Sequence, residues 1–229
     1  MSDRQSRRRG SELLAVRAWR FLPLLLFLAT GGLAIPKASA GRYNPDRDIG
    51  DTVPGWENLP GVDGKQHSWS DNASSELLVV VFTCNSCPYA VDYEPRINAL
   101  ARRWRQAGDR VRLVAINANT IPEDSFAAMR RRAEARQFAF PYLVDESQAV
   151  ARSFGAVRTP EFFVIDRERR IRYMGALDDS ADPAKVKIRY LEDAVEALLA
   201  GQPVAVAETP PVGCMIRARR SRRMRSATE

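Results

Sequence analysis

Cysteine and histidine are scarce in this chain, which has three cysteines and one histidine among its 229 residues. Three cysteines are too few for a disulfide framework, and 45% apolar residues over this length are enough to bury a core without one. A structural zinc site takes four cysteine or histidine ligands at short spacings. Cys214 and His67 instead lie far along the chain from the Cys84/Cys87 pair. The composition therefore argues against a zinc centre, and we expect neither a metal ion nor a cofactor.

Long apolar runs are also missing. The apolar run at 21–35 has 15 residues, fewer than the ~20 that span a bilayer comfortably. Six arginines precede it, and the small residues Ala38-Ser39-Ala40 follow it. This order is typical of a secretory signal. We therefore predict a signal peptide over 1–40, cleaved after Ala40, and export to the periplasm or another extracytoplasmic space. An uncleaved N-terminal membrane anchor is the alternative.

The folded part of the chain lacks excess positive charge. The formal net charge is +7, but residues 1–40 and 217–229 each carry a net +5, which leaves −3 for residues 41–216. A mildly acidic body does not favour a nucleic-acid groove, and we expect no nucleic-acid partner. The arginine-rich tail is interpreted as a solvated end. Any membrane contact is expected to be transient and to involve this tail or the N-terminal segment.

Against these absences stands the motif Cys84-Asn85-Ser86-Cys87, which directly follows the apolar segment 77–83. A strand that passes into a helix at a CxxC motif places the first thiol near free backbone N–H groups and the positive end of the helix dipole. We therefore expect Cys84 to be the more acidic and nucleophilic thiol. Its attack on a disulfide gives a mixed disulfide that Cys87 is close enough to displace. The motif predicts a redox site.

Strand and helix patterns alternate along the rest of the chain and predict an α/β fold with a mixed sheet covered by helices. We expect residues 41–48 to be a short linker, 49–202 the domain, and 203–229 a C-terminal extension with a basic tail. The expected strands lie at 77–83, 111–117, 140–144, 162–166 and 171–175, with helices after the motif to Gly108 and at 123–136, 148–154 and 185–199, and two short extended pieces within 56–69.

Four stretches follow one another along the chain: FTCNSCPY at 82–89, FPYLVDE at 140–146, TPEFF at 159–163 and GCMI at 213–216. In this order they resemble the redoxin family (alkyl hydroperoxide reductase/thiol-specific antioxidant), and most closely a peroxiredoxin-like branch with a CxxC motif. The resemblance implies a thioredoxin-like fold, a central mixed β-sheet covered by helices on both faces. It further implies that Cys84 attacks and Cys87 resolves, the two forming the redox-active disulfide. A cis Pro160 would face them and present the Thr159 backbone to a substrate.

The motif departs from the usual thioredoxin pattern in two ways. Asn85 and Ser86 replace the Gly-Pro that thioredoxins usually carry between the cysteines, so the direction of electron flow stays open. The preceding segment 77–82 also contains no carboxylate. The nearest candidates for proton transfer are Glu76, Asp92 and Glu94.

Three functions are compatible with two thiols at this spacing. We favour thiol–disulfide exchange with protein or small-molecule disulfides, with a thiol electron donor. Peroxiredoxins carry the pattern P-x-x-x-[T/S]-x-x-C. When its cysteine is matched to Cys87, Cys84 stands where the pattern has Thr or Ser, and Val80 stands where it has Pro. Because both residues of the pattern are replaced, peroxidase activity on hydroperoxides, an antioxidant role, is the alternative and not the first choice. A copper chaperone using both thiolates and His67 is the second alternative, because soft thiolates suit Cu(I).

Cys214 is the odd cysteine. The segment after Gly201 is rich in proline and long enough to cross the domain, but its sequence does not specify that it ends at the motif. We therefore expect Cys84 and Cys87 to be the complete catalytic unit. The resemblance makes Cys214 a candidate third redox thiol.

Overall fold

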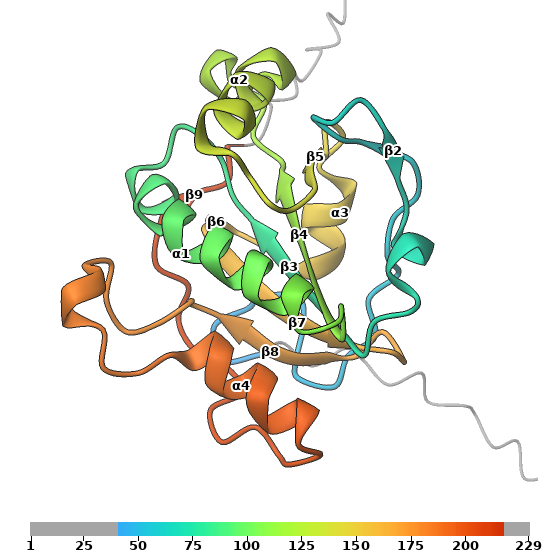
Figure 1. The fold of residues 1–229 in the computed structure, drawn as a ribbon, viewed down its shortest axis with the longest axis vertical. Coiled ribbons are helices and arrows are strands. Elements are labelled where there is room, and N and C mark those ends of the chain that lie inside the picture. The colour runs from blue at the N-terminus through green and yellow to red at the C-terminus, as the bar shows by residue number, and fades with distance from the viewer. Residues whose placement is uncertain (1–40, 218–229) are drawn as a thin grey trace, which may run out of the picture. The chain divides into compact units, whose positions relative to one another are not determined.

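A five-stranded mixed sheet lies at the centre of the computed structural model, which describes residues 41–217 (Figure 1). Its strand order is β5-β4-β3-β7-β8. β3, β4 and β5 run parallel, whereas β7 is antiparallel to β3 and to β8. The predicted mixed sheet is confirmed. Its strands are β3 (Leu77–Phe82), β4 (Val111–Asn117), β5 (Tyr142–Val144), β7 (Glu161–Asp166) and β8 (Ile171–Gly175).

Strand β3 is buried on both faces, and its side chains divide the core in two. Successive side chains of a strand point to opposite faces. Leu77, Val79 and Val81 join one hydrophobic cluster, while Leu78, Val80 and Phe82 join the other. A strand covered on both sides reads as a continuous apolar run, which is why 77–83 lacks alternation.

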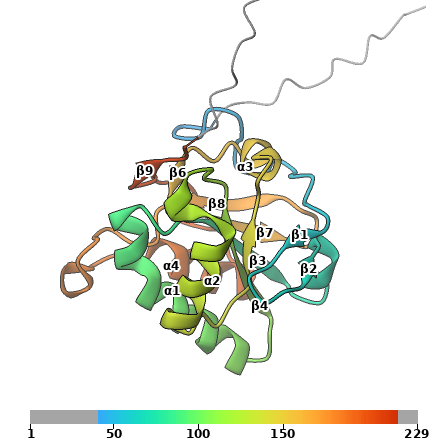
Figure 2. The same cartoon turned by 90° about the horizontal axis from the view of Figure 1, so that it is seen from above.

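Helices cover both faces of the sheet, as predicted (Figure 2). The first cluster includes side chains of α1 (Pro88–Gln106), α2 (Phe126–Arg136) and α4 (Tyr190–Leu199). The second includes side chains of α3 (Ala149–Phe154). The short strands β1 (Leu59–Pro60) and β2 (Gln66–His67) pair with each other around a turn. No helix within residues 41–217 has the length and apolar character needed to cross a membrane.

The last helix is shorter than predicted, because side chains take up the backbone N–H groups that would begin it. We expected a helix from residue 185, but α4 begins at Tyr190 after the short 3₁₀ turn η3 (Pro183–Lys185). The Asp182 carboxylate accepts the N–H of Ala184. The Asp179 carboxylate accepts the N–H groups of residues 187 and 188, which lie further along the loop. Such local bonds compete with helix formation.

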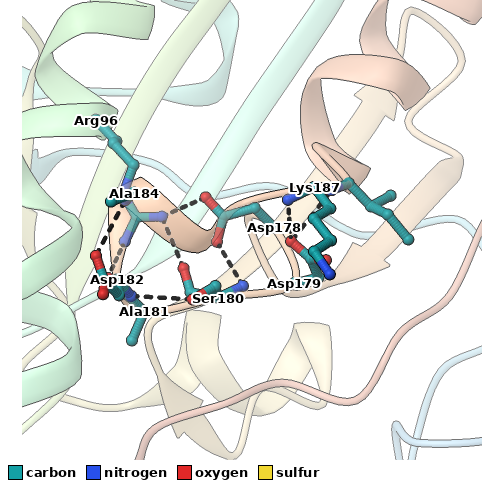
Figure 3. Close-up of polar contacts among 9 residues, drawn as sticks. Arg96, Asp178, Asp179, Ser180, Ala181, Asp182, Ala184 and Lys187 are labelled. Carbon is teal, nitrogen blue, oxygen red and sulfur yellow. Dashed lines mark hydrogen bonds and ion pairs between the residues drawn. The ribbon is translucent and has the colours of Figure 1, made fainter.

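Arg96 fastens this loop to α1 (Figure 3). Its guanidinium donates to the Asp178 carboxylate and to the carbonyl oxygens of Ser180 and Ala181. It also lies 4.0 Å from the ring centroid of Tyr93. Burial raises the pKa of Asp178, and the facing guanidinium opposes that rise. The loop after β8 is thereby held on the helix that begins directly after the cysteine motif.

The two flanking segments both pack on the body of the protein. In the expected linker 41–48, the N–H groups of Arg42 and Tyr43 donate to Glu208, and the buried Asn44 donates to the carbonyl oxygen of Phe154. In the extension, strand β9 (Cys214–Met215) pairs with β6 (Arg158–Thr159). The predicted signal peptide and most of the basic tail lie outside the described residues.

Candidate active site

The two cysteines of the motif lie where the central strand β3 ends. Cys84 and Cys87 are only 2% and 1% exposed. Helix α1 begins at Pro88, so Cys87 is its N-cap residue, and a proline at the first helical position is a common start. Both sulfurs are therefore covered by protein in the structure, and a reacting molecule has to approach through whatever covers them.

The Thr159-Pro160 peptide lies against both sulfurs, as the resemblance implied. Its bond is cis. The Thr159 hydroxyl is 3.3 Å from Cys84 Sγ. Cys87 Sγ lies 2.9 Å from the Thr159 carbonyl oxygen, to which a protonated Cys87 thiol donates. The structure thus brings together all four residues that we predicted for the dithiol and its substrate edge.

Cys214 is also at the site, which the sequence did not specify. In the β6–β9 pair Cys214 is the partner of Thr159. Its backbone N–H donates to Cys87 Sγ at 3.4 Å. Its side chain packs against the small cluster formed by Cys84, Cys87 and Ala90. The C-terminal extension therefore contacts the motif at Cys214, and the three cysteines of the chain gather in one place.

The close approach of β9 to Thr159 requires a glycine before Cys214. A Cβ atom added at Gly213 would collide with the Thr159 carbonyl oxygen and crowd the Pro160 nitrogen. The guanidinium of Arg158 donates to the Gly213 carbonyl oxygen at 2.9 Å. Only glycine permits the two backbones to lie this close.

A buried carboxylate that our sequence reasoning missed holds the motif loop. Asp124 is 2% exposed and belongs to the 3₁₀ turn η2 (Pro122–Asp124), which precedes the start of α2 at Phe126. Its Oδ1 accepts the N–H groups of Asn85 and Ser86 at 2.7 and 3.0 Å, and its Oδ2 accepts the Ser86 hydroxyl at 2.6 Å. We expected residues 123–136 to form one helix, and we assigned no role to this acid.

Two asparagines hold Asp124 in turn. Asn119 donates to the Asp124 carboxylate at 2.8 Å, and Asn117 donates to its carbonyl oxygen at 3.1 Å. Both asparagines are buried at the end of β4. Two asparagines and an aspartate directly after an apolar strand were the available signal, because buried polar side chains need partners.

The two thiols of the motif are hydrogen-bonded to each other, so the thiol of one stabilises a thiolate on the other. The hydrogen bond with Cys84 lowers the pKa of Cys87 to about 4 against the effect of burial, and the N–H groups of Ala90 and Cys214 add to the lowering. The same bond, followed by burial, raises the pKa of Cys84 well above its usual range, and Asp124 adds to the rise.

These directions run opposite to our expectation that Cys84 is the more acidic thiol, whereas the Thr159 carbonyl oxygen, 2.9 Å from Cys87 Sγ, favours a protonated Cys87. The order of acidity within the pair stays a prediction. The prediction placed Cys84 at the start of a helix with free N–H groups. In the structure α1 begins only after Cys87, and the N–H groups of Asn85 and Ser86 donate to the Asp124 carboxylate.

Of the three acids considered for proton transfer, only Glu94 lies at the site. It is buried, receives two hydrogen bonds from Arg132, and lines a cavity of about 10 Å³ together with Cys84. Glu76 instead pairs with Arg110 at the surface. Asp92 is exposed on α1.

His67, proposed as a copper ligand, is bonded to Asp63, whose carboxylate lies 3.1 Å from its Nε2. Within residues 41–217, no group of three or more His, Cys, Asp or Glu side chains has the arrangement of a metal site. No geometric observation therefore favours the copper-chaperone alternative.

Glu161 next to Pro160 is expected to make stability depend on pH. Burial raises its pKa to about 7, although the N–H groups of Val157 and Arg158 both donate to it. Because the folded protein then binds the proton more tightly than the unfolded chain does, this contribution is fully present below about pH 4.5. It is lost as the pH rises towards 7, by about 3 kcal/mol in total.

Glu161→Gln keeps an acceptor for both N–H groups but removes the titration. We expect the free energy of unfolding of this variant, measured in urea between pH 5 and 8, to fall less than that of the unaltered protein. Glu168→Gln on the exposed turn after β7 is the matched control. Parallel pH curves for the Glu161 variant and the unaltered protein would contradict the assignment.

The sheet order, with a CxxC motif after β3 and a cis proline opposite it, defines a thioredoxin-like fold. The model of the Redoxin family matches residues 40–190, and the chain therefore belongs to the redoxin family. The structural and sequence evidence together support a thiol oxidoreductase or thiol peroxidase.

Solved structures of several bacterial proteins are similar to this one. An uncharacterized conserved protein from Geobacillus kaustophilus is 35% identical, with a TM-score of 0.70 over 76% of this chain and 94% of that one. Peroxidoxin BcpB from Mycobacterium tuberculosis is 26% identical, with a TM-score of 0.51 over 66% and 96% of the two chains. A structure described as a thiol:disulfide interchange protein from Chlorobium tepidum is 22% identical, with a TM-score of 0.55 over 66% and 98%, and supports the fold alone. Among curated proteins, no match was found.

Proposed function

We propose that the protein is an exported thiol–disulfide oxidoreductase that works through the Cys84/Cys87 dithiol and a mixed-disulfide intermediate. The observation that carries the proposal is the contact of both sulfurs with Thr159, at 3.3 and 2.9 Å. Two thiols this close to each other and to one backbone group can attack a disulfide and then resolve the mixed disulfide. Protein or small-molecule disulfides are the proposed substrates, and a thiol compound the electron donor.

The charge distribution assigns the two sulfurs their roles in this proposal. Cys87, as thiolate, attacks one sulfur of the substrate disulfide, and the other sulfur leaves as a thiolate that takes up a proton. Cys84 then gives up its proton and attacks Cys87 Sγ, which releases the second substrate thiol and forms the Cys84–Cys87 disulfide. Two electrons pass from the dithiol to the substrate. This order reverses the one implied by the resemblance.

Peroxidase activity is the second candidate, and the likeness to a peroxidoxin supports it. The peroxidase pattern matched to Cys87 requires a hydroxyl residue where Cys84 stands and a proline where Val80 stands. We therefore favour disulfide exchange.

The two activities are separated by measuring both on the same reduced, purified protein. We expect the second-order rate constant with glutathione disulfide or a peptide disulfide to exceed that with hydrogen peroxide by about tenfold or more, because Cys84 and Val80 replace the hydroxyl residue and the proline of the peroxidase pattern. Cys87→Ser is the control for both reactions. Faster reaction with peroxide would move the protein to the second candidate.

Export rests on the pattern of residues 1–40, which combines six arginines, an apolar run of 15 residues and an A-x-A site. Sequencing of the mature N-terminus in cell fractions tests it. A protein that begins at Gly41 outside the cytoplasm agrees with the proposal. A full-length protein in the cytoplasm contradicts it.

A further inference from the structure

The backbone edge proposed for the substrate is occupied by the chain itself. Strand β9 pairs with β6 so that Cys214 lies opposite Thr159. An extended peptide carrying a reactive cysteine would pair with this edge in the same manner. The segment 213–215 thus presents a cysteine to the dithiol as a substrate would.

Contacts on both sides of Cys214 fix this register. Before it, Gly213 fits against the Thr159 carbonyl group only because it has no side chain, and Arg158 donates to its carbonyl oxygen. After it, the N–H of Ile216 donates to the Val157 carbonyl oxygen at 2.9 Å. The N–H of Arg217 then donates to Asn119 at 2.8 Å. The segment is held by specific contacts and is not a loose end.

The three cysteines differ in their exposure to solvent. Cys84 and Cys87 are almost fully buried, whereas Cys214 is half-buried and its neighbour Met215 is 68% exposed. An external thiol therefore reaches Cys214 more readily than either cysteine of the motif. Thiol–disulfide exchange requires such access to the attacked sulfur.

We propose that Cys214 is a third redox residue that takes over the disulfide from the Cys84–Cys87 pair and carries it to the surface. This inference rests on the proposed function. The Cys214 thiolate attacks Cys87 Sγ, the Cys87–Cys214 bond forms, and the Cys84–Cys87 bond breaks. Its electron pair stays on Cys84, which takes up the proton that Cys214 gave up, so the step involves no net oxidation.

The surrounding charges suit this step. In the reduced protein the pKa of Cys214 is raised, first by its hydrogen bond to Cys87, while Arg217 and Arg158 act to lower it. Once Cys87 is part of a disulfide it carries no charge, and the two arginines remain. The thiolate of Cys214 is then favoured when its target is oxidised.

The cycle closes with an external dithiol as the reductant. One of its thiolates attacks the sulfur of Cys214, and Cys87 leaves as a thiolate. A thiol with a low pKa is a good leaving group. The second thiol of the reductant then displaces Cys214, so that the reductant is oxidised to a disulfide and all three cysteines are reduced.

Disulfide mapping of the full-length protein tests the transfer. The reduced protein is oxidised with one equivalent of diamide, a thiol oxidant, so that the result does not depend on activity towards any disulfide substrate. It is then alkylated and digested with trypsin. We expect a linked pair of peptides containing Cys87 and Cys214, because Cys84–Cys87 alone gives one internally linked peptide. Absence of the linked pair, with Cys214 fully alkylated, would overturn the inference.

Three variants test the role of the segment in re-reduction. The rate at which dithiothreitol reduces the oxidised protein is expected to fall about tenfold in Cys214→Ser, which removes the exposed sulfur. Gly213→Ala keeps the thiol but displaces the strand, and we expect it to share both the slower reduction and the loss of the linked peptides. Met215→Ala, whose side chain is exposed on the same strand, is the matched control.

The outcomes separate this inference from the function on which it rests. Should Gly213→Ala fail to fold, the nearly isosteric Cys214→Ser still decides the question. Reduction of Cys214→Ser as fast as that of the unaltered protein would overturn the relay. Failure of the reduced protein to react with any disulfide substrate would count against the proposed function, and the mapping after diamide would still report whether Cys214 exchanges.

Discussion

The Cys87→Ser variant is expected to lose disulfide turnover by about 10³-fold or more, the scale on which removal of a covalent nucleophile acts. The physical reason is that Cys87 is the attacking thiolate in the proposed mechanism, because its hydrogen bond with Cys84 lowers its pKa while that of Cys84 is raised. A serine hydroxyl at this position has no comparable nucleophilicity. Turnover with a peptide disulfide at pH 7 measures the loss.

The matched variant Cys84→Ser distinguishes attack from resolution. It keeps the attacking thiolate and lacks the resolving thiol, so glutathione disulfide should add one glutathione to Cys87 and stop there. Because Cys214 lies beside Cys87, both variants are made in a Cys214→Ser background. Intact-protein mass reports the adduct. Rapid formation of the adduct in the Cys87→Ser protein, and none in the Cys84→Ser protein, would return the attacking role to Cys84.

Asp124→Ala is expected to destabilise the protein by about 2–4 kcal/mol, because it leaves several donors without their acceptor. These are the N–H groups of Asn85 and Ser86, the Ser86 hydroxyl and the Asn119 amide. The loop that follows Cys84 thereby loses the buried carboxylate that holds it. Urea unfolding measures the change, with Glu123→Ala on the exposed side of the same turn as the control.

Asp124→Asn separates charge from structure. Its shape is retained, but the negative charge that helps to raise the pKa of Cys84 is removed. We therefore expect Cys84 to be alkylated at lower pH than in the unaltered protein. An unchanged pH profile in the folded variant would show that Asp124 acts only by bonding the loop.

The fold was predictable from the sequence wherever burial or turn chemistry is local. The continuous apolar run of β3 indicated a strand covered on both faces, and that prediction is confirmed. The helix boundaries at 126 and 190 were not predictable in the same way. At these places a 3₁₀ turn precedes the helix, and before α4 backbone N–H groups donate to a side-chain carboxylate. The spacing of apolar residues does not indicate such bonds.

The site was predictable as a set of residue types but not as a set of contacts. Cys84, Cys87, Thr159 and Pro160 were identified from the motif and the resemblance, and the structure brings all four together. The order of acidity within the pair was not identified. It depends on where α1 begins and on which N–H groups remain available, and both are results of packing.

The sequence by itself determined that this is an α/β protein with a CxxC motif at the end of a buried strand, since strand burial and motif spacing are properties of neighbouring residues. Only the tertiary structure decided that Asp124 holds the motif loop and that Cys214 lies beside Cys87. Asp124 is 37 positions from Cys87, and Cys214 is 127. Such encounters arise from the pairing of β6 with β9 and the packing of η2 on the loop, and no local pattern along the chain encodes them.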